Sequence, residues 1–275
     1  MRFVFLLFCY WGLTNACLNT APPKLYGRAS DFADQPVWEE HFNKDGQPDT
    51  AIWSYDIGDN GWGNNELQYY TDAITNAVIR NGMLHIIALK EQRAKSRYTS
   101  ARLVTRHKKD FLYGRIEVKA KLPAGVGTWP AIWMLPTDWS YGGWPQSGEI
   151  DIMEHVGKDE GMVHFSVHTA AYNHIQGTQK TAQQKVSNAT SDFHLYRVDW
   201  TPDYIKGFFD DREVFSFEND HKGDYNTWPF DKKFYLLLNI AIGGNWGGPD
   251  VDEHIFPAAM VIDYIKYYPF IGKSE

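Results

Sequence analysis

Residues 148–154 read Gly-Glu-Ile-Asp-Ile-Met-Glu and place three carboxylates in a stretch that is otherwise apolar. In a β-strand alternate side chains share a face, so Glu149 and Asp151 point to one side and Glu154 falls out of phase. One extra residue at Ile152-Met153, a β-bulge, would restore the phase and turn all three acids to the same face. The stretch therefore predicts a bulged strand with one dry face and one acidic face.

Several other segments carry the same two-residue period. Residues 115–122 alternate charged and apolar side chains and end at Pro123, which is typical of a strand with one wet and one dry face. Residues 78–80 and 83–89 flank Asn81-Gly82, the strongest short signal for a hairpin turn. Further strands are expected at residues 163–168, 195–200, 204–209, 213–217, 234–242 and 260–268.

Many short strands without long helical periodicity predict an all-β fold. The expected architecture is a two-sheet antiparallel β-sandwich of jelly-roll type, whose concave sheet carries a substrate cleft. A length of 275 residues suits one large domain of this kind. We expect a signal peptide at residues 1–16, a proline-containing arm at 17–36 and a single catalytic sandwich domain at 37–275.

The first residues have the pattern of an export leader. Arg2 precedes a mostly apolar run over residues 3–11, and small residues follow up to Ala16. That run is too short to cross a bilayer, and no later run reaches the needed length, so no membrane span is expected. Cys9 falls inside the leader, which leaves Cys17 as one thiol without an internal disulfide. Lipid anchoring through Cys17 is the alternative to free secretion.

Charge and aromatic content narrow the classes of partner. The formal net charge is −7, and the chain has no basic stripe, which argues against nucleic acid as a partner. Aromatic residues make up 16% of the chain, including 11 Trp. Exposed rings stack on sugar faces and buried rings pack in cores, so we expect both uses here. Asn188-Ala189-Thr190 is an N-glycosylation acceptor if the source is eukaryotic. A monomer is expected.

Crowded carboxylates are unfavourable unless the chemistry uses them. A pair of acids, one ionised and one kept protonated by its neighbours, carries out glycoside hydrolysis. Two simpler interpretations are a solvated strand edge and a site for a hard cation such as calcium. The apolar neighbours Ile150, Ile152 and Val156 favour burial over a solvated edge, and calcium would be better served by a loop rich in Asp, Asn and Gly.

The chain resembles glycoside hydrolase family 16, specifically its laminarinase-like endo-β-1,3-glucanases. Beyond the acidic strand, the resemblance extends over nearly the whole chain after the leader in several separate stretches. They lie at residues 61–70, 113–115, 129–136, 142–145, 193–196, 239–246 and 261–265. The resemblance implies a concanavalin A-like sandwich and a retaining, endo-acting hydrolase of β-1,3-glucan.

By that resemblance Glu149 is the nucleophile, Asp151 the assisting carboxylate and Glu154 the general acid and base. The spacing Glu-x-Asp-x-x-Glu, with Met153 as the extra residue, resembles the laminarinase branch and differs from the lichenases, whose acids lack the bulge. Bulged relatives also include enzymes that act on seaweed galactans. A mixed-linkage glucan or a galactan therefore stays open as an alternative substrate.

Other residues are candidates for substrate binding. Four tryptophans could line the sugar subsites, although a single tryptophan is more often part of a core. His168 could bond the acid/base residue or a substrate hydroxyl, and its neighbour His164 has the same strand parity. Asn65, Glu66 and Arg102 could bond hydroxyls or simply cap loops and carry solvated charge. The tryptophans are Trp129, Trp133, Trp144 and Trp246.

No cofactor is expected for catalysis, but the resemblance implies one structural metal. The Gly82 carbonyl and Asp263 correspond to positions where relatives hold calcium on the face away from the cleft, and oxygen ligands suit that ion. An ordinary strand aspartate is the simpler interpretation of Asp263.

Two other functions fit the same fold. A glucan-recognition protein would keep the sandwich and lose catalysis, but such proteins typically replace the acids that stand here at Glu149, Asp151 and Glu154. A transglycosylase would form the same glycosyl-enzyme and pass it to a sugar instead of water. The sequence does not separate a transglycosylase from a hydrolase.

Overall fold

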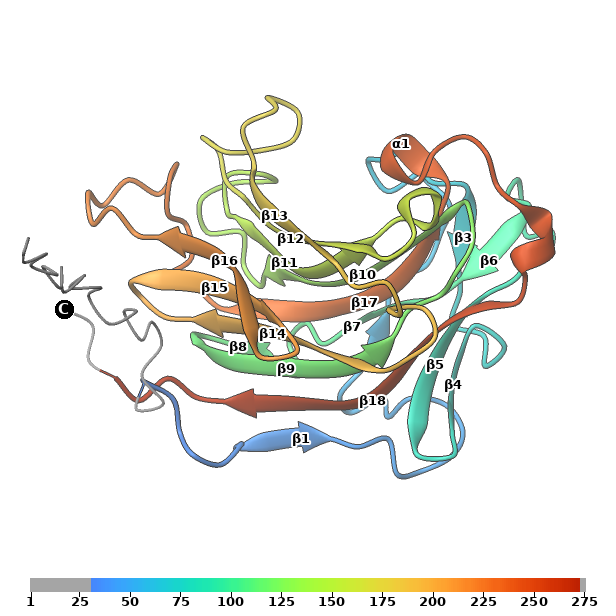
Figure 1. Cartoon of the computed structure of the whole chain (residues 1–275), viewed down its shortest axis with the longest axis horizontal. Helices are drawn as coiled ribbons and strands as arrows, with labels where there is room; N and C mark the ends of the chain where they lie inside the picture. The colour runs from blue at the N-terminus through green and yellow to red at the C-terminus, as the bar shows by residue number, and fades with distance from the viewer. Residues whose placement is uncertain (1–30, 273–275) are drawn as a thin grey trace, which may run out of the picture.

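A computed structural model describes residues 31–272, in which two large antiparallel sheets pack face to face (Figure 1). The outer sheet has the order β16-β15-β14-β9-β18-β5-β4, with β1 paired to β18. Its strands are β1 Trp38–Glu40, β4 Ala77–Arg80, β5 Met83–Ala88, β9 Gly114–Lys121, β14 His194–Trp200, β15 Tyr204–Phe209, β16 Arg212–Glu218 and β18 Ala258–Tyr268.

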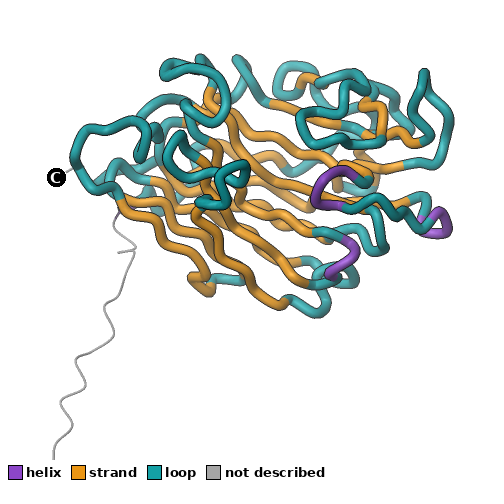
Figure 2. Tube along the Cα trace, turned by 90° about the horizontal axis from the view of Figure 1, so that it is seen from above, coloured by secondary structure: helices purple, strands orange, loops and turns teal. Residues whose placement is uncertain are grey.

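The second sheet has the order β13-β12-β11-β10-β17-β7-β2, with β8 paired to β17. Loops surround its strands when the molecule is seen from above (Figure 2). Its strands are β2 Ser54–Tyr55, β7 Arg102–Val104, β8 Asp110–Phe111, β10 Thr128–Pro136, β11 Glu149–His155, β12 Met162–His168, β13 Lys180–Lys185 and β17 Phe234–Ile242. The remaining elements are the parallel pair β3 Gln68–Tyr70 and β6 Tyr98–Ser100 and the short helices η2 Gly157–Asp159, α1 Gly244–Gly247 and η3 Glu253–Ile255.

The sandwich forms because the strands have the period expected from the sequence. In β9 buried and half-buried residues alternate along the whole strand, and the buried ones face the space between the sheets. Asn81 and Gly82 both have positive φ, 55° and 71°, as a two-residue turn between β4 and β5 requires. The predicted all-β sandwich is confirmed, and among the described residues the α-helix is limited to four residues in α1.

A β-bulge in β11 is also confirmed. Asp151 lies opposite Ser166 of β12, and Glu154 lies opposite His164, so the two residues between the acids face the single residue Phe165. Both intervening side chains, Ile152 and Met153, are fully buried in the core. The bulge therefore packs two successive side chains inward and brings Glu154 back to the face that carries Glu149 and Asp151.

Some sequence predictions concern residues outside the sandwich. The signal peptide at residues 1–16 and Cys17 lie outside the described residues. Within the predicted arm, Phe32 is buried and forms a β-bridge with Phe270.

Asn188 is exposed after β13, and its amide donates to Asp192 Oδ2 at 2.9 Å. Within residues 31–272 no helix has the length and hydropathy to cross a membrane.

Candidate active site

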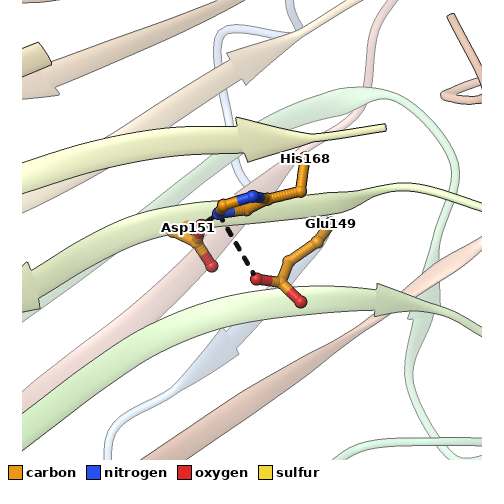
Figure 3. A group of neighbouring side chains, drawn as sticks. All are labelled: Glu149, Asp151 and His168. Atoms are coloured by element: carbon orange, nitrogen blue, oxygen red, sulfur yellow. Dashed lines mark ion pairs between the residues drawn. The ribbon is translucent and has the colours of Figure 1, made fainter. Parts of the chain in front are cut away.

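The three acids lie on the concave face of the second sheet, next to His168 of β12. Register places Glu149 directly opposite His168. The His168 Nε2 atom is 3.3 Å from Asp151 Oδ2 and 3.8 Å from Glu149 Oε1, and Figure 3 shows the ring facing both carboxyl groups. The sequence prediction placed His168 against the acid/base Glu154 or a hydroxyl, whereas its nitrogen contacts Glu149 and Asp151. The reason is that the bulge shifts Glu154 along the strand, opposite His164.

Indole groups hold the two outer acids. Trp144 Nε1 donates to Glu149 Oε2 at 2.9 Å, and Trp129 Nε1 donates to Glu154 Oε1 at 3.1 Å. Trp246 of α1 packs edge-on against Trp129, with ring centroids 5.5 Å apart, and also against His164 at 4.8 Å. Each outer acid therefore has its own indole donor, which fixes one oxygen and leaves the other for different partners.

Burial changes the protonation of all three acids. It raises the pKa of Glu149 well above the usual carboxyl range, and the neighbouring charge of Asp151 raises it further. Burial and the charge of Glu154 raise the pKa of Asp151 in the same direction. Burial also raises the pKa of Glu154, although His168 and the Trp129 hydrogen bond partly oppose the shift. The three carboxyl groups together therefore retain protons in a pH range where exposed carboxyl groups would be ionised.

Trp133 of β10 lies opposite Asp151 in the register of β10 with β11. Its Nε1 donates to Asn239 Oδ1 at 2.7 Å, and Asn239 Nδ2 donates to the Tyr70 hydroxyl at 3.0 Å. That hydroxyl donates to Glu66 Oε2 at 3.2 Å, and Gln68 donates to the same oxygen at 2.6 Å. Glu66 is thus the end of a partly buried chain of hydrogen bonds that leads to the Trp133 indole.

The Arg102 guanidinium contacts two indole rings and one carboxylate. It stacks on the rings of Trp62 and Trp133, at 4.7 and 4.8 Å from the ring centroids, and its Nε lies 3.0 Å from Asp56 Oδ2. The side chain is only 10% exposed. This environment makes Arg102 a support for the two indole rings. Asn65 Nδ2 donates to Asn245 Oδ1 at 2.8 Å, which joins its loop to α1.

Rings and aliphatic side chains form a second apolar cluster, separate from the core, on the concave side. Trp133, Trp139 and Trp144 pack partly exposed against four buried residues. The four are Val104, Leu135, Tyr235 and Leu237. Half-exposed indoles beside carboxylates give a surface that can stack on sugar rings and hydrogen-bond hydroxyls.

A separate hollow of about 720 Å³ lies among the loops at 59–67, 95–98 and 249–253. It shares Asn65 and Glu66 with the predicted substrate-binding residues, but none of the three β11 acids lines it. We place the chemistry at the acids, because a reaction needs the proton donors and acceptors that converge there.

Some contributors to the site carry no clear mark in the sequence. Asn239 and Tyr70 are separated by 169 positions and meet only through folding. His174 lies in the loop after β12, where its ring approaches that of Trp144 at 4.9 Å and that of His168 at 5.3 Å. Trp62 belongs to a stretch that carries the family resemblance, and that stretch was the one signal available for it.

The predicted calcium position lies at the outer sheet. Gly82 is in the β4–β5 turn, and Ile262 pairs with Leu84, so Asp263 is located beside that turn. The Asp263 carboxylate forms an ion pair with Lys119 at 2.9 Å. A cation there would compete with the ammonium group for this carboxylate, which favours the simpler interpretation of an ordinary strand aspartate. A calcium ion at Gly82 and Asp263 stays a prediction from resemblance.

An antiparallel sandwich with buried acids and half-exposed indoles on its concave sheet defines a carbohydrate-active hydrolase. Comparisons with known proteins give the family. The model for glycosyl hydrolases family 16 matches residues 64–266. The chain is 51% identical over 243 residues to a beta-glucanase of Rhodothermus marinus, covering 86% of this chain and 85% of that protein. The chain belongs to glycosyl hydrolases family 16, which confirms the resemblance.

Solved structures agree with this assignment. The X-ray structure of the laminarinase from Rhodothermus marinus has a TM-score of 0.85 and 48% identity, covering 89% of this chain and 100% of that chain. The crystal structure of a non-specific endo-β-1,3(4)-glucanase from family GH16 has a TM-score of 0.82 and 44% identity, covering 88% of this chain and 92% of that one.

Proposed function

We propose that this protein hydrolyses internal β-1,3-glucosidic bonds of laminarin-type β-glucans. The observation that carries the proposal is the convergence of three acids on one concave face, with Asp151 buried and the half-buried Glu149 and Glu154 each bound by its own indole. The relatives described as beta-glucanase and laminarinase support this substrate class.

We infer a retaining double displacement. Glu149 attacks the anomeric carbon while Glu154 gives its proton to the departing glycosidic oxygen, so the C–O bond breaks as the glycosyl-enzyme ester forms. Glu154, now ionised, takes a proton from water, which attacks the same carbon and releases Glu149. Nuclear magnetic resonance of the first product tests this assignment. A β-anomer is expected, whereas an initial α-anomer would contradict a retaining mechanism.

Asp151 decides which acid is charged. Glu149 and Asp151 lie in one buried pair whose mutual repulsion opposes double ionisation. The Trp144 N–H donates to Glu149 and favours the anionic form there. Glu149 is the member of the pair that accepts this N–H, so we infer that it is ionised when it attacks and that Asp151 is a positioning residue.

Incubation with laminarin tests the activity itself. Hydrolysis predicts new reducing ends and a fast fall in chain length, because internal cuts shorten chains before much free sugar appears. Redistribution of chain lengths without new reducing ends would instead favour a transglycosylase. Binding without any change in the glucan would favour a recognition protein.

A wider linkage range is the second candidate. The structural relative described as a non-specific endo-β-1,3(4)-glucanase favours mixed-linkage glucan as an additional substrate. Parallel digestion of laminarin, lichenan, agarose and carrageenan measures this range. Faster cleavage of agarose or carrageenan than of laminarin would move the proposal to galactans.

We also propose that the protein is exported and acts as a monomer. The leader-like pattern at residues 1–16 supports export, and lipid attachment at Cys17 is the alternative. The mass of the N-terminal peptide of secreted protein distinguishes a free cut end from a lipid-modified cysteine.

The pH profile should respond to the Trp129 hydrogen bond. Replacing Trp129 by Phe removes the N–H that stabilises ionised Glu154, so the pKa of Glu154 is expected to rise. Glu154 acts as an acid in its protonated form, and the basic limb of the kcat/KM profile on laminarin should therefore move to higher pH. W246F, which removes the neighbouring indole, should leave the basic limb in place. A shift to lower pH in W129F would contradict the assigned acid.

Asn239 should affect binding more than chemistry. Asn239→Leu removes the acceptor of the partly buried Trp133 N–H, which is expected to lower the free energy of unfolding by about 1 kcal/mol. Release of the indole should raise KM for laminarin several-fold with little change in kcat. Tyr70→Phe is the matched control, because it cuts the chain beyond Asn239 and keeps the Trp133 bond. Equal KM increases in both variants would argue against a positioning role for Asn239.

A further inference from the structure

Glu149, Asp151 and His168 form a set of metal-binding atoms as well as a set of acids. One carboxylate oxygen from each acid and one nitrogen of His168 lie within 4.8 Å of one another. The three atoms come from two adjacent strands, β11 and β12, whose register places Glu149 opposite His168. In Figure 3 the ring edge faces the two carboxyl groups from the neighbouring strand. Backbone hydrogen bonding between strands therefore holds the three ligands in place without a flexible loop.

The spacing of these atoms suits a small divalent cation. Zinc binds histidine nitrogen and carboxylate oxygen at about 2.0–2.2 Å in tetrahedral geometry, which separates ligand atoms by roughly 3.3–3.5 Å. The separations are 3.3 Å from His168 Nε2 to Asp151 Oδ2, which is already in this range, and 3.8 Å from His168 Nε2 to Glu149 Oε1. All three ligand atoms lie within 4.8 Å of one another, so small side-chain movements would close the set around one ion. Three protein ligands also leave a fourth position for water.

A buried atom without a partner points into the same space. Asp151 Oδ2 has no hydrogen-bond partner among the described residues, although the Asp151 side chain is only 3% exposed. The nearest polar atom recorded for it is His168 Nε2, on a side chain that is 7% exposed. A buried carboxylate oxygen without a hydrogen bond is costly, and a cation bound between this oxygen and His168 Nε2 would give the oxygen a partner.

We propose that Glu149, Asp151 and His168 form a binding site for a divalent transition-metal cation of the zinc type, and that the cation inhibits the enzyme. The imidazole ligand favours zinc, cobalt or copper, whereas magnesium and calcium prefer oxygen ligands throughout. Binding occupies Glu149 Oε1, the carboxyl oxygen that does not accept from Trp144, so the nucleophile is no longer free to attack the sugar. Inhibition rests on the proposed function, but metal binding rests on the three side chains alone.

Calorimetric titration of the untagged protein with zinc chloride tests the site. One zinc ion per chain is expected, with binding weakened at least tenfold in His168→Asn. His164→Asn is the matched control, because His164 is on the same strand and the same face but packs against Trp246, outside the ligand set. Equal affinity in His168→Asn and the wild type would overturn the site, as would a wild type that binds no zinc at millimolar concentration.

Cobalt provides a readout that needs no variant. The wild-type protein with one equivalent of Co²⁺ should show the intense visible absorption of a four-coordinate site with a nitrogen ligand, and zinc should abolish it. Weak absorption of an octahedral, all-oxygen site would contradict the proposal. Zinc and not magnesium should also inhibit laminarin hydrolysis. Zinc binding in a protein that hydrolyses no glucan would leave the metal site standing and refute only the proposed function.

Discussion

Glu149→Gln is expected to lower kcat on laminarin by roughly 10⁴-fold or more. The amide cannot form the glycosyl ester, and no neighbouring residue can take over as nucleophile. The change removes one charge and almost no volume. The Trp144 N–H keeps an oxygen to bind, since the amide still has a carbonyl. Folding and substrate affinity should therefore remain close to those of the wild type.

Three measurements check the Glu149 variant together. Initial rates give kcat, calorimetry with a laminarin oligosaccharide gives affinity, and thermal unfolding gives stability. The matched control is Glu218→Gln, an exposed acid at the end of β16 on the outer sheet, which should keep full activity. Turnover in Glu149→Gln near the wild-type rate would refute the nucleophile assignment, and loss of folding would show that the carboxylate is structural.

Glu154→Ala is expected to lose activity on laminarin. With an activated aryl glucoside as substrate, added azide should restore part of the turnover. With an activated aryl glucoside the leaving group needs no proton, so the glycosyl-enzyme still forms without the acid. The same change removes the base that activates water, and the intermediate should accumulate. Azide, which needs no base, should then restore turnover and yield a β-glycosyl azide if configuration is retained.

The product identifies the role of Glu154 more sharply than the rate. Rescue by azide with a β-product supports Glu154 as acid and base, and an α-product would assign it to the nucleophile position. Trp129→Phe serves as the control, since it keeps Glu154 and removes only its indole donor. The Trp129→Phe variant should turn over its substrate without added azide. Absence of rescue in Glu154→Ala would move the acid elsewhere in the cleft.

The two variants together distinguish the roles of the outer acids. Burial raises the pKa of Glu149 well above the usual carboxyl range and raises that of Glu154 less strongly, so the pKa shifts by themselves do not assign the nucleophile to Glu149. Their neighbours differ. Glu149 lies beside Asp151, whose charge raises its pKa, and accepts a hydrogen bond from Trp144, whereas Glu154 accepts one from Trp129 at the α1 side of the face. The assignment follows from these partners and from the family.

Local sequence pattern determined the all-β class, because the side-chain period of two is a property of each strand by itself. Residues 204–209 and 234–242 coincide with β15 and β17, and the Asn81-Gly82 turn lies where its need for positive φ predicted. The bulge was also predictable, because carboxylates out of phase in an apolar strand leave few other solutions. Short strands such as β2 and β8, two residues each, have too few positions for a period and were not predicted.

The tertiary structure alone decided which side chains meet at the acids. That His168 contacts Glu149 and Asp151 depends on the register of β11 with β12, which is set by non-local hydrogen bonds and by the bulge between them. That Asn239 holds Trp133 depends on β17 lying next to β10. The sequence predicted Arg102 as a residue that bonds substrate hydroxyls, with a solvated charge as the simpler interpretation, and only its packing between Trp62 and Trp133 shows that it is buried against two indole rings. Sequence period reports the face of a residue, and only contacts between distant strands report its neighbours.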